Sequence, residues 1–176
     1  ILRADDTKYL FEILSNIASA FSDYAKLPKK NIERLDLRDL IINTINLYDN
    51  NENIKINLIE DEGCNYDINS DKNNLSIVFG NILKNAIQAV GKKEGGLINI
   101  NIKDHGDSFL IKIEDNGCGI ADDEKKKIFM PNFTTKSSGM GVGLSIVYDI
   151  LETLGGNISF ESEIGKGTTF TIDIKK

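Results

Sequence analysis

The stretch at about 72–90 constrains the fold most, because its residues have the pattern of one long and largely apolar helix. Asp71 stands before it as an N-cap residue, and Gly91 ends it. So many apolar side chains on one helix need a second layer of structure to cover them. They are Leu75, Ile77, Val78, Ile82, Leu83, Ala86, Ile87, Ala89 and Val90.

The elements around this helix do not follow the strict βαβ alternation of a parallel sheet. Asp36 is the expected N-cap of a helix at about 37–49, and two more helices are predicted at about 122–128 and 144–154. Strands are predicted at 54–59, 64–68, 97–103, 108–114, 157–162 and 168–174. Helices on one face of a mostly antiparallel sheet are the natural packing. We therefore expect an α+β fold, a two-layer α/β sandwich.

A further helix is predicted near the N-terminus, at 7–27. Its apolar residues alternate at spacings of four and three, a seam that suits a helical bundle or coiled coil. A helix packed on its own domain has the same pattern. The chain opens on Ile1 in the middle of this pattern, so we expect a piece of a longer protein. The predicted organisation is a bundle helix at 1–27, a linker at 28–35 and the main domain at 36–176.

The charge balance excludes some classes of partner. The chain has 21 basic and 27 acidic residues and a net charge of −6. Without a basic run it has no electrostatic footprint for nucleic acid. No apolar stretch approaches the roughly 20 residues that span a bilayer, and no leader peptide is visible. Cys64 and Cys118 form neither a metal-ligand cluster nor a disulfide framework. A reduced, cytoplasmic setting is expected.

Polar residues form a stripe along the helix at 72–90. Asn81, Lys84, Asn85 and Gln88 stand at i, i+3, i+4 and i+7, which places them on one side. A solvated outer face would have the same pattern. Two asparagines one turn apart can also direct carbonyl oxygens at a hard cation, which prefers oxygen ligands.

The strand at 108–114 runs into the sequence Asp115-Asn-Gly117-Cys-Gly119-Ile120. Two spaced glycines let the backbone approach a planar ligand closely, and the carboxylate can accept a hydrogen bond from an exocyclic amine. A tight turn stabilised by the Asp side chain is the alternative.

Further along, Gly139, Gly141 and Gly143 alternate before a helix that starts near Leu144. Free N–H groups at a helix start form an anion site. A flexible lid is the alternative, and the two are compatible. The spacing matches neither a Walker loop nor a dinucleotide fingerprint. Just upstream, Phe129 and Phe133 are expected to anchor the segment on the core.

Taken in order, these segments resemble the N, G1, F and G2 boxes of the sensor histidine kinase ATP-binding domain, the Bergerat or GHKL fold. The boxes are Asn81 to Ala86, Asp115 to Ile120, Phe129 to Lys136, and Gly139 to Leu144. The closing Gly165-Lys-Gly-Thr-Thr-Phe is similar to the last hairpin of the family. The resemblance covers about residues 37–176. The sequence Pro-Asn-Phe-Thr-Thr-Lys, followed by a short lid, is most similar to the nitrogen-regulation branch of these kinases.

The resemblance implies ATP and Mg²⁺ as cofactors. It implies that Asn85 ligates Mg²⁺ with Asn81 beside it, and that Lys84 lies near the phosphates, so Lys84 and Asn85 are the implied catalytic residues. Asp115 would accept from the adenine amino group. Gly117 and Gly119 would line the base, and Thr169 would lie near it. Gly141, Gly143 and Leu144 would surround the triphosphate, and the further implied contacts are Gln88, Ile120, Phe133, Thr134, Thr135, Lys136, Gly139 and Val142.

The resemblance also extends to the N-terminal helix, which is similar to the end of the second dimerisation helix of such kinases. It implies that the parent protein is a homodimer and that the partners of this domain are a phosphoacceptor dimerisation domain and a response regulator. Membrane anchoring of the parent protein is compatible with this arrangement. The acceptor histidine of the family lies on the first dimerisation helix. The one histidine of this chain, His105, falls in a predicted hairpin turn and is not expected to be the acceptor.

Three functions are consistent with these motifs. The first is a histidine kinase module that phosphorylates a histidine outside this chain. The second is a nucleotide sensor without transfer activity. The third is a GHKL ATPase of the chaperone, topoisomerase or mismatch-repair type, which the short chain disfavours.

Overall fold

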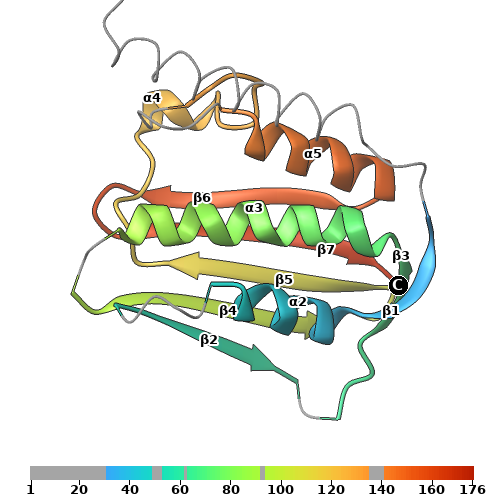
Figure 1. Ribbon diagram of the computed structural model, residues 1–176. Helices are drawn as coiled ribbons and strands as arrows, with labels where there is room; N and C mark the ends of the chain where they lie inside the picture. The colour runs from blue at the N-terminus through green and yellow to red at the C-terminus, as the bar shows by residue number, and fades with distance from the viewer. Residues whose placement is uncertain (1–30, 49–52, 62, 92–93, 135–140) are drawn as a thin grey trace, which may run out of the picture.

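A mixed sheet covered on one face by helices is the frame of the molecule (Figure 1). The computed structural model describes residues 31–48, 53–61, 63–91, 94–134 and 141–176. The helix predicted at 7–27 lies outside these residues. Within them, the expected α+β two-layer architecture is confirmed.

The sheet has five strands in the order β2-β4-β5-β7-β6. The β2–β4 pair is parallel, and the other three pairs are antiparallel, so the predicted mostly antiparallel sheet is confirmed. All five strands lie within two residues of their predicted positions. They are β2 (Ile54–Glu60), β4 (Gly96–Asp104), β5 (Ser108–Asp115), β6 (Asn157–Glu163) and β7 (Gly167–Lys175).

A second, two-stranded sheet pairs β1 (Glu33–Asp36) with β3 (Asp67–Ser70). Both strands differ from expectation. The strand predicted at 64–68 begins later, because the Tyr66 hydroxyl accepts from the Asp61 N–H at 2.9 Å and donates to the Asp61 carbonyl at 3.0 Å, which closes a loop there. Most of β1 falls in the predicted linker at 28–35, and its pairing with β3 attaches this part of the linker to the domain.

Helix α3 (Lys72–Val90) runs along the sheet as predicted. The Asp71 side chain caps it by accepting from the N–H of Asn74 at 3.0 Å, and Gly91 ends it with a φ of 61°. Its apolar side chains are buried in the core between the helices and the sheet. This burial stabilises the domain by covering the apolar side that a lone helix would expose to water.

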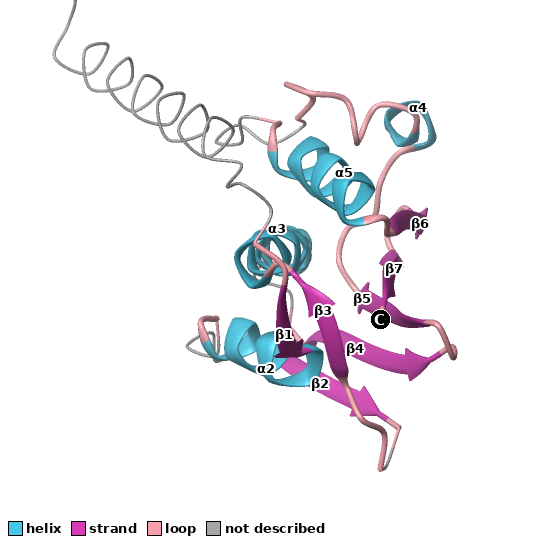
Figure 2. Cartoon of the chain, turned by 90° about the vertical axis from the view of Figure 1, so that its right-hand side faces the viewer, coloured by secondary structure: helices cyan, strands magenta, loops and turns pink. Residues whose placement is uncertain are grey.

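Helices α2 (Leu37–Asn46) and α5 (Gly143–Leu154) lie on either side of α3, and all three cover the same face of the sheet (Figure 2). The expected N-cap of α2 is present, because Asp36 accepts from the N–H of Asp39 at 2.9 Å. Helix α4 (Asp122–Lys125) is shorter than the predicted 122–128. None of the helices in the described part of the chain is long and apolar enough to cross a membrane.

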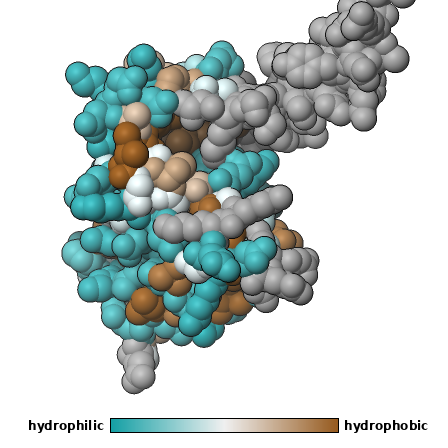
Figure 3. All heavy atoms as spheres, turned by 90° about the vertical axis from the view of Figure 1, so that its left-hand side faces the viewer, coloured by the Kyte–Doolittle hydropathy of each residue, from teal (hydrophilic) through white to brown (hydrophobic). Residues whose placement is uncertain are grey.

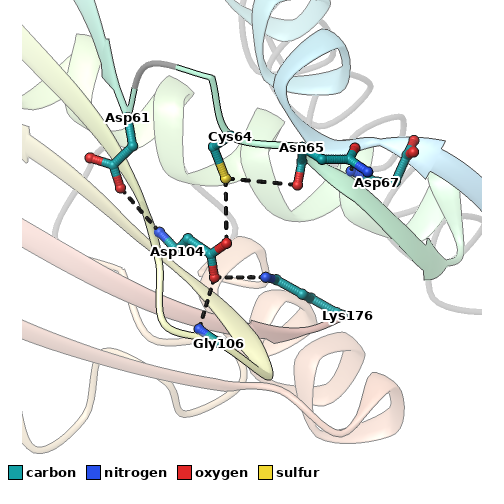
Figure 4. A network of polar contacts seen from close by, with 7 residues as sticks. All are labelled: Asp61, Cys64, Asn65, Asp67, Asp104, Gly106 and Lys176. Atoms are coloured by element: carbon teal, nitrogen blue, oxygen red, sulfur yellow. Dashed lines mark hydrogen bonds and ion pairs between the residues drawn. The ribbon is translucent and has the colours of Figure 1, made fainter.

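A polar network closes the end of the sheet where β4 ends (Figure 4). The Asp104 carboxylate accepts from the Lys176 ammonium at 2.6 Å and from the Gly106 N–H at 2.8 Å. The hydrogen bond from Lys176 is the main cause that lowers the pKa of Asp104. The Cys64 thiol donates to the same carboxylate at 3.4 Å, and burial first, then this bond, raises the pKa of the thiol. The network connects the C-terminal residue to the β2–β3 and β4–β5 connections.

Candidate functional site

The predicted motifs meet at the other end of the sheet, where β5 and β6 end and α5 begins (Figure 1). Figure 3 shows the molecule from this side: apolar surface lies in the middle of a largely hydrophilic face. Segments far apart in the sequence form this end, namely the second half of α3, the turn after β5, the β6–β7 turn and the start of α5.

Asp115 is the buried carboxylate of the site. Strand alternation places it there, because Phe109, Ile111 and Ile113 point from β5 into the core and Asp115 is the next residue on that side. Its side chain is buried, and one oxygen, Oδ1, accepts from the Gly117 N–H at 2.8 Å. A carboxylate that accepts hydrogen bonds is thus held at the border of the apolar core.

The turn after Asp115 is packed on both sides by backbone. On the α3 side, the Cys118 N–H donates to the Ala89 carbonyl at 3.1 Å. A Cβ at Gly117 would come within 2.5 Å of the Ala89 backbone, so only glycine fits there. The Asn116 side chain adds two bonds to the start of β4: its Oδ1 accepts from the Leu97 N–H at 3.0 Å, and its Nδ2 donates to the Gly95 carbonyl at 2.9 Å.

The β6–β7 turn holds the other side of the same segment. Gly119 has a φ of +73°, and a Cβ there would lie 2.2 Å from the Glu163 carbonyl oxygen. The Gly165 N–H donates to the Cys118 carbonyl at 2.8 Å, and the Ile120 N–H donates to Ser162 Oγ at 2.8 Å. Close contacts within the protein therefore account for the glycines that were predicted to line a base.

The stripe of polar residues on α3 faces the start of α5. Asn81 donates from Nδ2 to the Ile77 carbonyl at 2.9 Å, which leaves Oδ1 directed toward α5. A Cβ at Gly143 would lie 2.7 Å from this oxygen. Asn85, one turn further along α3, is half-buried, while Lys84 and Gln88 are exposed. The structure thus brings the first and the fourth motifs together.

Helix α5 begins at Gly143 without a side-chain cap, since its N-cap residue is Val142. The first turn of a helix carries N–H groups without intrahelical partners and the positive end of the helix dipole. Gly141 has a φ of +68°, and its Cα lies against the Phe133 backbone, where a Cβ would come within 2.4 Å. The half-buried Leu144 follows in the first turn. This helix start is suited to bind an anion.

The described part of the segment that follows α4 is anchored as predicted. The Phe129 ring packs against Tyr148 of α5 and Phe160 of β6, with 5.8 Å between ring centroids in each pair. Phe133 is half-buried at the edge of the core, and Thr134 is exposed. Of the predicted contacts, Thr135, Lys136 and Gly139 lie outside the described residues.

The two threonines of the last hairpin point in opposite directions. Thr169 alternates with Thr171 and Asp173 on the uncovered face of the sheet, so its side chain points away from that of Asp115. Thr168 is buried and pairs in register with Asp115. The alternation Thr168, Phe170, Ile172, Ile174 is visible in the sequence and could have identified it. Ser162, in register with Thr168, carries no such signal.

Together these groups have the chemistry of a nucleotide site. Asp115 and Thr168 offer acceptors for a base, α5 offers N–H groups for phosphates, and Asn81 and Asn85 offer amide oxygens on the same side of the molecule. The described part of the chain places all of them at one end of the sheet.

Comparison with known proteins also indicates a nucleotide-binding domain. Residues 70–176 match the family described as histidine kinase-, DNA gyrase B-, and HSP90-like ATPase. The chain is 34% identical over 162 residues to the sensor histidine kinase ZraS of Escherichia coli (strain K12), a match that covers 90% of this chain and 34% of that protein. The chain thus spans about a third of the length of this relative.

Two solved structures are similar as well. The catalytic domain of histidine kinase ThkA, in a nucleotide-free form, is 31% identical with a TM-score of 0.74, over 83% of this chain and 96% of that one. Histidine kinase ThkA in complex with the response regulator protein TrrA is 28% identical with a TM-score of 0.78, over 96% of this chain and 49% of that one. The nitrogen-regulation branch stays a prediction.

Proposed function

We propose that this chain, which belongs to the family of histidine kinase-, DNA gyrase B-, and HSP90-like ATPases, binds Mg·ATP and transfers the γ-phosphoryl group to a histidine outside the chain. The premise is that the chain contains the ATP-binding catalytic domain of a sensor histidine kinase. The proposed phosphoryl transfer concerns the whole protein, of which the chain covers a part. The support for the proposal comes from the geometry of the candidate site.

The observation that carries the proposal is the buried carboxylate of Asp115. Burying a carboxylate is costly unless hydrogen-bond donors compensate for its lost hydration, and such costly groups are often found at functional sites. Here the Gly117 N–H holds one oxygen, and strand alternation turns the side chain to the face of the sheet that the helices cover (Figure 2). An adenine amino group, which carries two N–H donors, is the complement of such an acceptor. We propose that Asp115 reads the amino group, with Thr168 beside it.

The phosphates are assigned to the start of α5 and the polar stripe of α3. Gly143 and Leu144 lie in the uncapped first turn of α5, where N–H groups can bind phosphate. The exposed Lys84 adds a positive charge on α3. Asn81 Oδ1 already points at this turn. Phosphoryl transfer requires mainly positioning and charge neutralisation, which the start of α5 and the polar stripe of α3 can supply.

The residues present fit a magnesium ion. Asn85 and Asn81 lie one turn apart on α3 and are oxygen donors of the kind that Mg²⁺ accepts, and the Asn81 amide is oriented by Ile77 so that its oxygen faces away from its own helix. When bound, Mg²⁺ would neutralise phosphate charge. The part of this chain is to hold and orient Asn85 and Asn81 on a rigid helix.

His105 lies in the wrong place to accept the phosphoryl group from this site. It stands in the turn between β4 and β5, whereas Asp115 ends β5. The 8 residues of β5 separate the two, and at about 3.4 Å a residue the separation is roughly 24 Å. The proposed acceptor therefore belongs to a dimerisation domain of the parent protein, of which residues 1–27 are proposed to be the last part.

Partners and location follow from the same proposal. ThkA has been solved with the response regulator TrrA, and we propose that a response regulator receives the phosphoryl group from the parent protein of this chain. We also propose a homodimer of the parent, formed through its dimerisation domain, and a cytoplasmic position for this domain, where ATP is available.

The decisive experiment is phosphoryl transfer in trans. The chain is incubated with γ-labelled ATP, Mg²⁺ and a fragment that carries the candidate acceptor helix of the same parent protein. We expect acid-labile label on a histidine of the fragment and none on His105. ATP binding without any phosphohistidine would instead identify a nucleotide sensor.

A second measurement tests the magnesium assignment. Asn85→Ala should abolish the part of ATP affinity that depends on Mg²⁺, because the ion loses an oxygen ligand. Calorimetric titration with Mg²⁺ and with EDTA separates the two parts, and Asn73→Ala, an exposed asparagine on the same helix, is the matched control. An unchanged Mg²⁺ dependence in Asn85→Ala would contradict the assignment.

A further inference from the structure

Ser162 connects the parts of the proposed base site without belonging to any of the predicted motifs. It is the sixth residue of β6 and points to the covered face of the sheet, like Phe160 two residues earlier. Its register partner on β7 is Thr168, and the register partner of Thr168 on β5 is Asp115. Asp115, Thr168 and Ser162 therefore form one row across three neighbouring strands.

The Ser162 hydroxyl makes three contacts. It accepts from the Ile120 N–H at 2.8 Å, donates to the Gly167 carbonyl at 3.0 Å, and lies 2.9 Å from the Thr168 hydroxyl. A serine hydroxyl has one hydrogen and two acceptor positions. Since Ile120 can only donate and the Gly167 carbonyl can only accept, the single hydrogen of Ser162 goes to Gly167. The Thr168 hydroxyl must then donate its hydrogen to Ser162.

The direction of this bond decides what Thr168 presents to a ligand. With its hydrogen directed at Ser162, Thr168 Oγ1 is left with acceptor capacity on the side of Asp115. The Asp115 carboxylate is an acceptor as well. Two neighbouring acceptors match the amino group of adenine and oppose the O6 carbonyl of guanine, which is itself an acceptor.

We propose that Ser162 is a positioning residue that sets the base selectivity of the site, by fixing the hydrogen of Thr168 and holding the Ile120 end of the Asp115 turn. The inference rests on the proposed function. Ser162 acts through Thr168 and Ile120 and does not itself contact the nucleotide. Without Ser162, the Thr168 hydroxyl is free to rotate and can donate its hydrogen to a bound base. The O6 carbonyl of guanine would then face one donor and one acceptor instead of two acceptors.

The test compares binding of ATP, GTP and inorganic tripolyphosphate by the full chain, in the presence of Mg²⁺. In Ser162→Ala we expect ATP affinity to fall about 3- to 10-fold, as for the loss of one or two neutral hydrogen bonds. GTP affinity should fall less or rise, so that the ATP/GTP preference decreases, and tripolyphosphate affinity should not change. Ser162→Thr, which keeps the hydroxyl, should restore the preference.

Ser159→Ala is the matched control, because it removes the same group from the same strand on the uncovered face, where Ser159 is exposed. Ser162→Cys, with a similar volume and weaker hydrogen bonds, carries the test should the alanine variant not fold. An ATP/GTP preference equal to that of the wild type in Ser162→Ala, or in Ser162→Cys, would overturn the inference alone. If the unaltered chain bound no ATP, the proposed function would fall with it.

Discussion

Two carboxylates at opposite ends of the sheet show how different surroundings give one residue type two roles. Asp115 is buried at the end of β5, where a backbone N–H holds it and a ligand is proposed to use it. Asp104 is exposed at the end of β4 and pairs with Lys176. The first is costly to bury and belongs to the proposed function, whereas the second contributes to stability through an ion pair.

Asp115→Asn should weaken ATP binding selectively. The substitution keeps the shape and an acceptor for the Gly117 N–H, but it removes the charge and turns a second acceptor into a donor. We expect about a 10- to 100-fold loss of ATP affinity, as for the loss of a charged hydrogen bond, and no loss for tripolyphosphate. Titration of both ligands measures this. Equal losses would contradict the role in reading the base.

Asp104→Asn should change how stability depends on pH. Lys176 lowers the pKa of Asp104 in the folded protein below its ordinary value of 3.8. A carboxylate with a lowered pKa stabilises the fold fully above its unfolded pKa, and this stabilisation is lost as the pH falls through the folded value. The difference in Tm between the wild type and the variant should therefore be largest above about pH 5 and shrink toward pH 3.

Thermal unfolding across this pH range measures the effect. Asp107→Asn removes another exposed carboxylate from the same turn and serves as the control. A Tm difference between the wild type and Asp104→Asn that stays constant from pH 7 to pH 3 would show that the ion pair with Lys176 does not stabilise the folded state.

At the scale of elements, the β6–β7 hairpin is the part that organises the site. Its turn bonds to the Asp115 turn through Gly165 and Ser162, and its first β7 residue, Gly167, meets the Asp115 backbone. A hairpin remote in sequence from Asp115 thus supports one wall of the site. The start of α5 and the stripe on α3 form another part of the site, where Gly143 lies against Asn81.

Gly167→Ala should be much more destabilising than Gly165→Ala. Both glycines have positive φ, +125° and +80°, so alanine is strained at each. At Gly167 a Cβ would also lie 1.8 Å from the Asp115 carbonyl oxygen, whereas at Gly165 nothing lies within 4 Å. We expect about 1–2 kcal/mol for Gly165→Ala from strain alone and about 3 kcal/mol or more for Gly167→Ala, where a steric clash is added.

Urea unfolding of the two variants measures these free energies. The two glycines lie two residues apart in the same hairpin, so the comparison measures the close contact with Asp115 together with the less accessible φ of Gly167. Similar free energies of unfolding would mean that β7 and the Asp115 backbone are not packed as closely as the structure has them.

At the scale of the whole molecule, the sheet has one covered and one uncovered face. Helices α2, α3 and α5 cover one side (Figure 2), and the strands alternate between buried apolar residues on that side and more exposed residues on the other. The central strands β5 and β7 are bonded on both edges, while β2 and β6 lie at the two edges of the sheet. Stability should therefore be distributed unevenly.

Hydrogen exchange should follow this order of strands. Amides of β5 and β7 are expected to exchange slowly, through global opening, and those of β2 and β6 at least about 10-fold faster, through local fraying. Mass spectrometry of exchanged peptides measures both. Equal protection of β2 and β5 would indicate that the edge strand opens only with the whole domain.

The sequence alone predicted helix α3 and the five strands of the main sheet, whereas β1 was not expected and β3 begins later than predicted. Helix α3 was predictable to both ends, because Asp71 and Gly91 act locally as caps. The five strands of the main sheet followed from alternation, and local patterns also singled out Asn81, Asp115 and Gly143 as candidate site residues. Local propensity and capping depend on neighbours along the chain, so a sequence carries them directly.

Only the tertiary structure decided which distant segments meet. It paired β2 with β4 in parallel and set Asp115, Thr168 and Ser162 in register across three neighbouring strands. It showed that Gly117 and Gly119 permit close packing against Ala89 and Glu163. These features depend on the register between strands and on contacts between segments remote in sequence. No single segment carries that information, because a shift of one residue in register turns every side chain to the other face.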